Sequence, residues 1–407
     1  RGGFTLEAAR AICGLDRTFA LVESLQDKSL LVRMPERRER FRMLEPIRHH
    51  ALELLSESGQ LEAVEGAHLA FFAALAERGD RELTGPAQSE WLRALSDDHD
   101  NLRAALERGR SQPPAERLRL ALALTRFWRV LGHLREGRAW LDDALAAPAP
   151  ASSERARALN QAAGLAWMQG DLDQARARLE ASLAAWRELG DEAGTQGSLA
   201  NLGVIASTQA DWQSGLAYLE EGLLVARRRE DQLAIGVLLG NLGVLGAHLG
   251  DHEAALERLI EAERVLSGLG DRARQANALA NLGLLAVRRR LTADAAGHYA
   301  RSLRLHASLR EPQSLAECLE GVAWIANRLG RPEPALRLGG AAAAIRQAFG
   351  APHRPWSRRV VDDWLEEART ALGPAADAAW SDGASLTLPE AIAAAAAECE
   401  AALELPH

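Results

Sequence analysis

Asn201-Leu202-Gly203 is the stretch that decides how the rest of this chain is interpreted, because it recurs. It returns as Asn241-Leu242-Gly243 and again as Asn281-Leu282-Gly283, so each copy begins 40 residues after the previous one. Self-similarity at a fixed period of roughly 20 to 50 residues is typical of stacked repeat architectures. The sequence therefore predicts a repeat array that runs from about Gln161 to Gly330.

Two other sets of positions keep the same register. One set is always small: Ala175, Gly215, Ala255, Ala295 and Ala335. The other set consists of dipeptides that end in Asp: Gly170-Asp171, Ala210-Asp211 and Gly250-Asp251, and half a repeat later Gly190-Asp191, Glu230-Asp231 and Gly270-Asp271. Glycine suits the left-handed residue that ends a helix, and Asp accepts hydrogen bonds from the N–H groups that begin the next one. Two such signals per repeat predict two helices per repeat.

The order of small and large residues resembles the tetratricopeptide pattern. That pattern has a usual period of about 34 residues, so the longer unit here indicates longer helices. A helical bundle without repeats would not explain the constant register. Because one helix pair cannot bury its own apolar stripe, neighbouring pairs are expected to stack. We therefore predict an α-solenoid of tetratricopeptide-like helix pairs, in a chain that is mainly α.

Residues 1–58 differ from the repeats. Thr5 is expected to cap a helix through Cys13, and Asp16 a second helix through about Leu25. Residues 29–34 and 41–44 have the composition of two strands around a charged turn, and Pro46 suits the first turn of a following helix. Helices, hairpin and helix are the outline of a small winged-helix domain, and we expect all strand structure to lie within residues 29–44.

The remaining chain divides at proline-rich breaks. We expect a helical linker domain over residues 59–112, the repeat solenoid over 113–350 and a C-terminal helical cap over 351–407. The repeats degrade near their end, where Arg290-Leu291 stands in place of Gly-Asp. Terminal repeats of solenoids are often atypical because they cap the stack.

Composition excludes several classes of function. The net charge of −8 does not favour binding to bulk nucleic acid. The three cysteines, Cys13, Cys318 and Cys399, are far apart, which suits a reducing cytoplasm and argues against a disulfide framework. No apolar run reaches about 18 residues, so we expect no membrane span. The chain begins at Arg1 without Met, within an expected domain, which suggests a fragment of a longer protein.

Several stretches together resemble one family, the large, mostly actinobacterial signal-transduction ATPases with numerous domains (STAND). The stretches are Gly2 to Ala9, Asp27 to Leu31, Phe41 to Arg48, Asp100 to Leu106 and Arg135 to Leu141. In that family a nucleotide-binding domain of the NB-ARC type precedes a winged helix and a tetratricopeptide-like sensor arm. A DNA-binding domain of the antibiotic-regulator or LuxR type lies at one end. The resemblance implies that this chain is the winged helix and sensor arm of such a transcriptional regulator.

The resemblance also implies partners and a cofactor. ATP or ADP would bind the domain upstream, because this chain has no phosphate loop of the form GxxxxGK followed by Ser or Thr. Plant-immunity relatives have Met-His-Asp where Met43-Leu44-Glu45 stands, so Leu44 cannot make their histidine's contact with ADP. The implied partners are the chain's own nucleotide-binding domain, a peptide, protein or small ligand that relieves autoinhibition, and possible homo-oligomers. The alternative is a protein–protein scaffold without nucleotide-dependent signalling.

Chemical sites are few. The helix from Arg17 to Leu25 offers little to base edges, so we expect no direct DNA binding. Asp97-Asp98-His99-Asp100 could suggest a metal, but acids are favoured at the start of a helix, and we interpret them so. No arrangement of nucleophile and base can be defended, and we expect a non-catalytic chain without a metal.

The repeated asparagines are the best candidates for a binding site. Asn201, Asn241 and Asn281 are expected to line the inner, concave face of the solenoid, with Gln161 at the equivalent place one repeat earlier. A side-chain amide both donates and accepts, so it can hold the backbone of an extended peptide. The alternative is that each Asn only bonds to a neighbouring helix.

Overall fold

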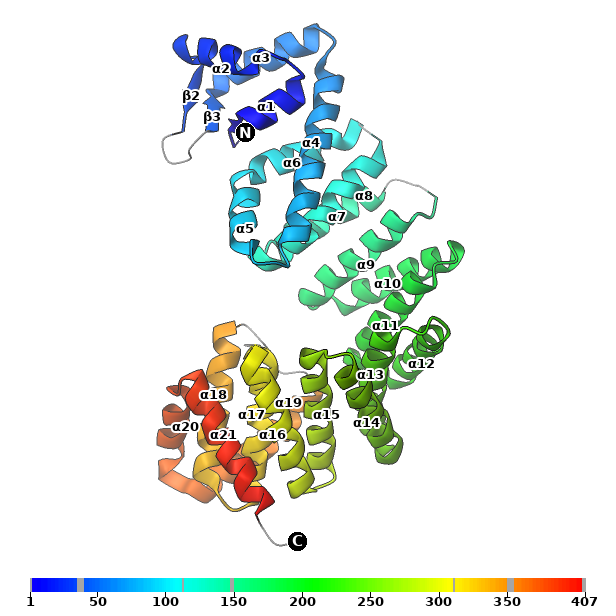
Figure 1. Cartoon of the computed structure of the whole chain (residues 1–407), viewed down its shortest axis with the longest axis vertical. Helices are drawn as coiled ribbons and strands as arrows, with labels where there is room; N and C mark the ends of the chain where they lie inside the picture. Colours follow the sequence, from blue (N-terminus) through cyan, green and yellow to red (C-terminus); the bar gives the residue numbers. More distant parts are fainter. Residues whose placement is uncertain are drawn as a thin grey trace. The chain divides into compact units, whose positions relative to one another are not determined.

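The computed structural model describes residues 2–34, 40–111, 113–146, 150–309, 312–349 and 355–404. It is mainly helical (Figure 1). The chain forms two compact units, residues 1–198 and 199–407.

The first unit begins with a three-stranded antiparallel sheet in the order β1-β3-β2. The strands are β1 (Phe4–Thr5), β2 (Leu31–Arg33) and β3 (Arg40–Met43). The strands at residues 29–44 are confirmed, but the expectation that strands are confined there is wrong. Phe4 pairs with Phe41, so the residues just before the first helix complete the sheet.

Three helices surround this sheet: α1 (Leu6–Cys13), α2 (Thr18–Asp27) and α3 (Glu45–Glu57). The Thr5 hydroxyl caps α1 by accepting a hydrogen bond from the Ala8 N–H, as predicted. Asp16 does not cap α2. Arg17 occupies the N-cap position without a side-chain cap, and the Thr18 hydroxyl instead donates to the Leu15 carbonyl. Pro46 lies in the first turn of α3, as expected.

Five further helices follow in the first unit. They are α4 (Leu61–Glu82), α5 (Gln88–Asp97), α6 (His99–Arg108), α7 (Pro114–Leu131) and α8 (Leu134–Ala146), with a short 3-10 turn, η1 (Gly109–Ser111). Phe72, Phe127 and Trp128 are buried in their shared core. Gly137 has a packing role, because a Cβ there would lie 2.6 Å from the Trp128 ring. That glycine allows α8 to lie directly on the indole.

The regular helix pairs follow, and they confirm the predicted α-solenoid of tetratricopeptide-like pairs. In order they are α9 (Ser153–Met168) and α10 (Leu172–Glu188), α11 (Glu192–Thr208) and α12 (Trp212–Arg228), α13 (Gln232–Leu249) and α14 (His252–Gly268), α15 (Arg272–Arg288) and α16 (Thr292–Leu309), α17 (Pro312–Arg328) and α18 (Pro332–Phe349). We call α9, α11, α13, α15 and α17 the first helices and their partners the second helices.

The turns between these helices have the predicted chemistry. Gly170, Gly250 and Gly270 adopt the left-handed conformation, and the aspartate after each accepts a hydrogen bond from the N–H three residues on. Ala210, Glu230 and Arg290 also have positive φ, between 54° and 60°. The turn geometry is therefore kept even where glycine is replaced.

The small positions lie where two helices meet most closely. Ala175, Ala255, Ala295 and Ala335 are completely buried, and Gly215 is buried as well. The glycine of each Asn-Leu-Gly copy receives a large side chain from the second helix of the same pair. A Cβ at Gly203 would lie 2.4 Å from Leu219, and one at Gly243 would lie 2.5 Å from Leu259. The glycine of each repeat thus leaves the space into which the large side chain of the second helix packs.

The C-terminal helices cover the end of the last pair. They are α19 (Pro355–Leu372), η2 (Gly373–Ala375), α20 (Ala376–Ala384) and α21 (Leu388–Leu403). Trp364 and Cys399 join the core formed by α16, α17 and α18. A Cβ at Gly383 would lie 1.9 Å from the Arg337 carbonyl oxygen, so α20 and α18 touch through their backbones.

Helix α13 needs a comment, because its length and composition alone would allow it to cross a membrane. It is the one such helix among the described residues, and its 18-residue window is 56% buried. The expectation that no apolar run reaches about 18 residues is therefore wrong for this helix. The buried residues of α13, among them Leu238, Leu239 and Leu242, pack in the core of the second unit.

We expect Ala255→Leu to destabilise the second unit by about 1–3 kcal/mol, because the added atoms must enter a close helix crossing. Ala255 is fully buried, whereas Glu257 on the same helix is exposed. Glu257→Leu is the matched control and should change the free energy of unfolding by less than about 0.5 kcal/mol. Urea unfolding of both variants is the measurement, and equal midpoints would contradict the packing argument.

Candidate functional sites: a buried junction and the exposed face of the first helices

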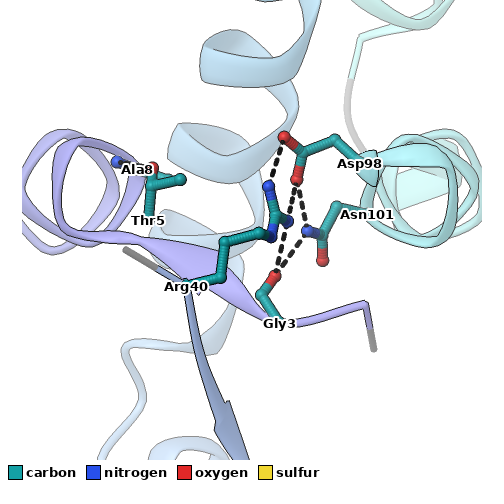
Figure 2. Close-up of polar contacts among 6 residues, drawn as sticks. All are labelled: Gly3, Thr5, Ala8, Arg40, Asp98 and Asn101. Atoms are coloured by element: carbon teal, nitrogen blue, oxygen red, sulfur yellow. Dashed lines mark hydrogen bonds and ion pairs between the residues drawn. The ribbon is translucent and has the colours of Figure 1, made fainter. Parts of the chain in front are cut away.

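A buried ion pair joins the small sheet to the helices that follow. The Arg40 guanidinium on β3 donates to both carboxylate oxygens of Asp98, at 3.0 and 2.5 Å, and to the Gly3 carbonyl at 3.2 Å (Figure 2). The side-chain amide of Asn101 donates to the same carbonyl at 2.7 Å and to Asp98 at 2.8 Å. Four residues from three segments thus form one closed network.

The acidic run lies at the start of α6, as expected: Asp98 is the N-cap residue and Asp100 lies in the first turn. The Asp98 carboxylate makes no cap hydrogen bond. It binds Arg40 instead, and the two side chains are only 14% and 7% exposed. Hydrogen bonding to Asp98 raises the pKa of Arg40 above its usual value, although burial opposes the charge. The acidic residue is therefore a fixed partner for a buried cation that lies 58 residues earlier.

A second contact joins α6 to α8. Arg103 donates twice to the Glu136 carboxylate, both at 2.6 Å, and His99 Nε2 lies 3.1 Å from the same carboxylate. Burial lowers the pKa of His99, so the ring is neutral near pH 7. Burial opposes the charge of Glu136, yet the hydrogen bonds from Arg103 bring its pKa below the usual value. Two stretches that carried the family resemblance, residues 100–106 and 135–141, thus meet in space.

The candidate asparagines occupy equivalent places in the middle of the first helices. Asn201 on α11 is exposed, and Asn241 on α13 and Asn281 on α15 are half-buried. Gln161 on α9, in the first unit, is half-buried as well. Each Asn precedes a buried leucine, and α13 contacts α15. Asn241 and Asn281 therefore lie on adjacent helices, outside the core. A peptide groove along them stays a prediction.

Sequence reasoning missed a cluster on the same faces. Trp212, at the start of α12, stacks on His248 of α13 with ring centroids 5.1 Å apart and planes inclined by 5°. Arg288 of α15 donates from Nη1 to the Ala247 carbonyl at 3.3 Å, and its Nη2 lies 3.3 Å from both ring nitrogens of His248. His248 and Arg288 are one repeat apart in the sequence. That spacing is the sequence signal by which this cluster could have been found.

Burial governs the charges of this cluster. Burial, followed by the nearby Arg288 charge, lowers the pKa of His248 to about 4, so the imidazole is neutral near pH 7. Burial also lowers the pKa of Arg288, although an arginine keeps its charge at any ordinary pH. The cluster therefore presents one positive charge beside two flat rings.

Metal chemistry has no candidate in the part of the chain that the structure describes. No three His, Cys, Asp or Glu side chains there are grouped closely enough to hold an ion. Burial raises the pKa of the Cys318 and Cys399 thiols to about 12, so both are poor nucleophiles near neutral pH.

About half of the chain is similar in sequence to proteins named as transcriptional regulators. No family model matches it. Proteins of Mycobacterium bovis and Mycobacterium tuberculosis, both provisionally named HTH-type transcriptional regulators, are 36% identical to it over 211 residues. The match covers 47% of this chain and 23% of each relative. The chain therefore corresponds to less than a quarter of the length of these relatives.

Solved structures support the fold. The apo form of RapI aligns with a TM-score of 0.55 at 12% identity, over 69% of this chain and 98% of that one. A Rap protein complexed with competence and sporulation factor gives 0.51 at 14% identity, over 81% and 96%. A Pyrococcus horikoshii STAND protein with a tetratricopeptide repeat sensor gives 0.47 at 13% identity, over 93% and 62%, a score that supports no inference. These likenesses establish a tetratricopeptide-like fold and nothing about function.

Arg40→Met should destabilise the first unit by about 3–5 kcal/mol, because it leaves the buried Asp98 carboxylate without its cation. Arg119→Met is the control. Arg119 also pairs with a carboxylate on another helix, Glu77, but is 45% exposed, and exposed pairs contribute about 0–1 kcal/mol. Urea unfolding measures both changes. Hydrogen exchange should localise the first to β1 and β3, and equal losses for the two variants would refute the assignment.

Replacing Asn201, Asn241 and Asn281 together by Ala should weaken peptide binding at least tenfold, since each lost hydrogen bond contributes about 0.5–1.5 kcal/mol. The probe is an array of random 12-residue peptides, from which those retained by the unmodified chain are synthesised and titrated. Glu220→Ala with Glu257→Ala, on second helices, is the control and should leave binding unchanged. A triple variant that unfolds would show that the asparagines are structural.

Proposed function

We propose that this chain is the sensor and protein-interaction arm of a STAND-type ATPase that regulates transcription. Ligand binding on the exposed face of the first helices would relieve autoinhibition of an upstream nucleotide-binding domain in the cytoplasm. The observation that carries the proposal is the 36% identity to the mycobacterial regulators over half the chain. The upstream nucleotide-binding domain is part of the proposal because residues 2–9, 27–31 and 41–48 resemble the STAND winged helix.

The surface of the winged-helix segment supports such a partner. Six large apolar side chains there are at least 42% exposed: Leu15, Phe19, Leu21, Val32, Leu44 and Leu54. Single exposed apolar residues are ordinary, but a concentration of them within one small domain is typical of an interaction surface. Leu44 lies at the N-cap of α3, at the position where the resemblance implies that plant-immunity proteins have the histidine that contacts ADP. A neighbouring nucleotide domain would remove these side chains from water.

A peptide is proposed as the ligand by analogy with a protein of similar fold. One neighbour in structure, the Rap protein, is complexed with competence and sporulation factor. In this chain the first helices present amides at a regular spacing, and packed helices lie roughly 8 to 10 Å apart. An extended chain rises about 3.3 Å per residue, so one repeat corresponds to about three ligand residues.

The first test is the sequence encoded before Arg1, where we expect a phosphate-binding loop.

The second test is a substitution. Phe19→Asp should weaken binding of the purified upstream domain at least tenfold, because it places a charge in the apolar contact. Leu224→Asp is the matched control, since Phe19 is 60% exposed and Leu224 on α12 is 59% exposed. Calorimetry measures both. Absence of the loop, or equal binding by both variants, would leave the simpler scaffold function in its place.

A further inference from the structure

Arg288 is half-buried and differs in its partners from the buried arginines of the described chain. Arg40, Arg117 and Arg346 each pair with a carboxylate, namely that of Asp98, Asp143 and Glu320. Arg288 is half-buried, and its recorded partners are the Ala247 carbonyl and His248. Within the described residues no carboxylate lies at ion-pair distance from it. A partly desolvated cation without a counterion is unfavourable, which makes it a candidate for an external anion.

The surroundings of Arg288 favour an anion with one charge. His248 contributes no charge near neutral pH, so the cluster carries a single positive charge. A carboxylate would neutralise it and accept two parallel N–H bonds from the planar guanidinium. A phosphate dianion would bring an uncompensated negative charge into a half-buried place. The flat surfaces of Trp212 and His248, stacked on one another, offer an apolar wall for the carbon atoms next to the carboxylate.

The cluster also lies beside the row of asparagines, displaced from it along the helices. Arg288 follows Asn281 by seven residues on α15, and His248 follows Asn241 by seven residues on α13. Seven residues are about two helical turns, so each pair lies on one face of its helix, roughly 10 Å apart. An extended peptide spans that distance with about three residues. The amides and the cation can therefore contact one ligand.

We propose that Arg288, supported by His248 and Trp212, binds a carboxylate of a peptide that lies on the exposed face of the first helices. This inference rests on the proposed peptide-binding function and adds the chemical class that the ligand must carry. The carboxylate belongs either to the C-terminus of the peptide or to an Asp or Glu side chain. Arg288 thereby fixes the position of the ligand beside the amide row, about two helical turns along α15 from Asn281.

The test uses the full chain and the peptides that it retains from the random array. Each peptide is synthesised with a free C-terminus, with a C-terminal amide, and with Asp and Glu replaced by Asn and Gln. We expect one of the two neutralised forms to bind at least tenfold more weakly, and which one identifies the source of the carboxylate. Arg288→Met should remove that difference, and Arg288→Lys should keep part of it.

The control variant is Arg258→Met. Arg258 lies on a second helix and pairs with Glu220, so its loss should leave the preference for a carboxylate intact. Retention of peptides without any dependence on their carboxylates would overturn this inference and leave peptide binding standing. No retained peptide at millimolar concentration would overturn both. Tighter binding of phosphorylated peptides, or an Arg288→Met chain that no longer folds, would also overturn it, since the guanidinium would then serve phosphate or the fold.

Discussion

The close approach of the two helices in each pair is the constraint on which the repeats depend. Gly203, Gly243 and Gly283 leave room for a large side chain of the second helix, respectively Leu219, Leu259 and Tyr299. A Cβ added at any of these glycines would lie within 2.9 Å of two atoms of the facing side chain, so the two helices would have to separate. Separation would also expose the small residues at 215, 255 and 295, and the next pair would lose its packing surface. The space left by one glycine in each repeat therefore fixes the register in which the helix pairs stack.

Local signals explain what the sequence predicted correctly. A left-handed residue followed by Asp specifies a helix boundary with backbone chemistry alone, and Asp171, Asp231 and Asp271 each cap the expected helix. The two-residue strand at Phe4–Thr5 was missed because it is too short to show alternation, and it exists only through pairing with Phe41 and Arg40. At the next boundary neither Asp16 nor Thr18 caps the helix, because Arg17 occupies the N-cap position and the Thr18 hydroxyl donates to the Leu15 carbonyl.

The candidate sites likewise divide into those that local sequence signals indicate and those that only the folded chain reveals. Repetition indicated the asparagines, and they do lie outside the core on the first helices. The Arg40–Asp98 pair joins residues 58 positions apart, and nothing local distinguishes either from an ordinary surface charge. His248 and Arg288 could have been found by reading the positions seven residues after each Asn. Their importance depends on burial and on the missing carboxylate, which only the folded chain reveals.

Buried arginines have two different consequences in this molecule. Where a carboxylate meets the cation, as Asp98 meets Arg40, the pair resists separation, because parting them would leave a charge in a place poor in water. The ion pair thus ties the small sheet to helix α6. Where no carboxylate of the described residues meets the cation, as at Arg288, the same argument favours the external carboxylate that we propose. Arg288 and His248 belong to neighbouring first helices, and repeat proteins change through the contacts between neighbouring units. If the chain is a sensor arm, as we propose, a carboxylate held there would act on the contact between α13 and α15.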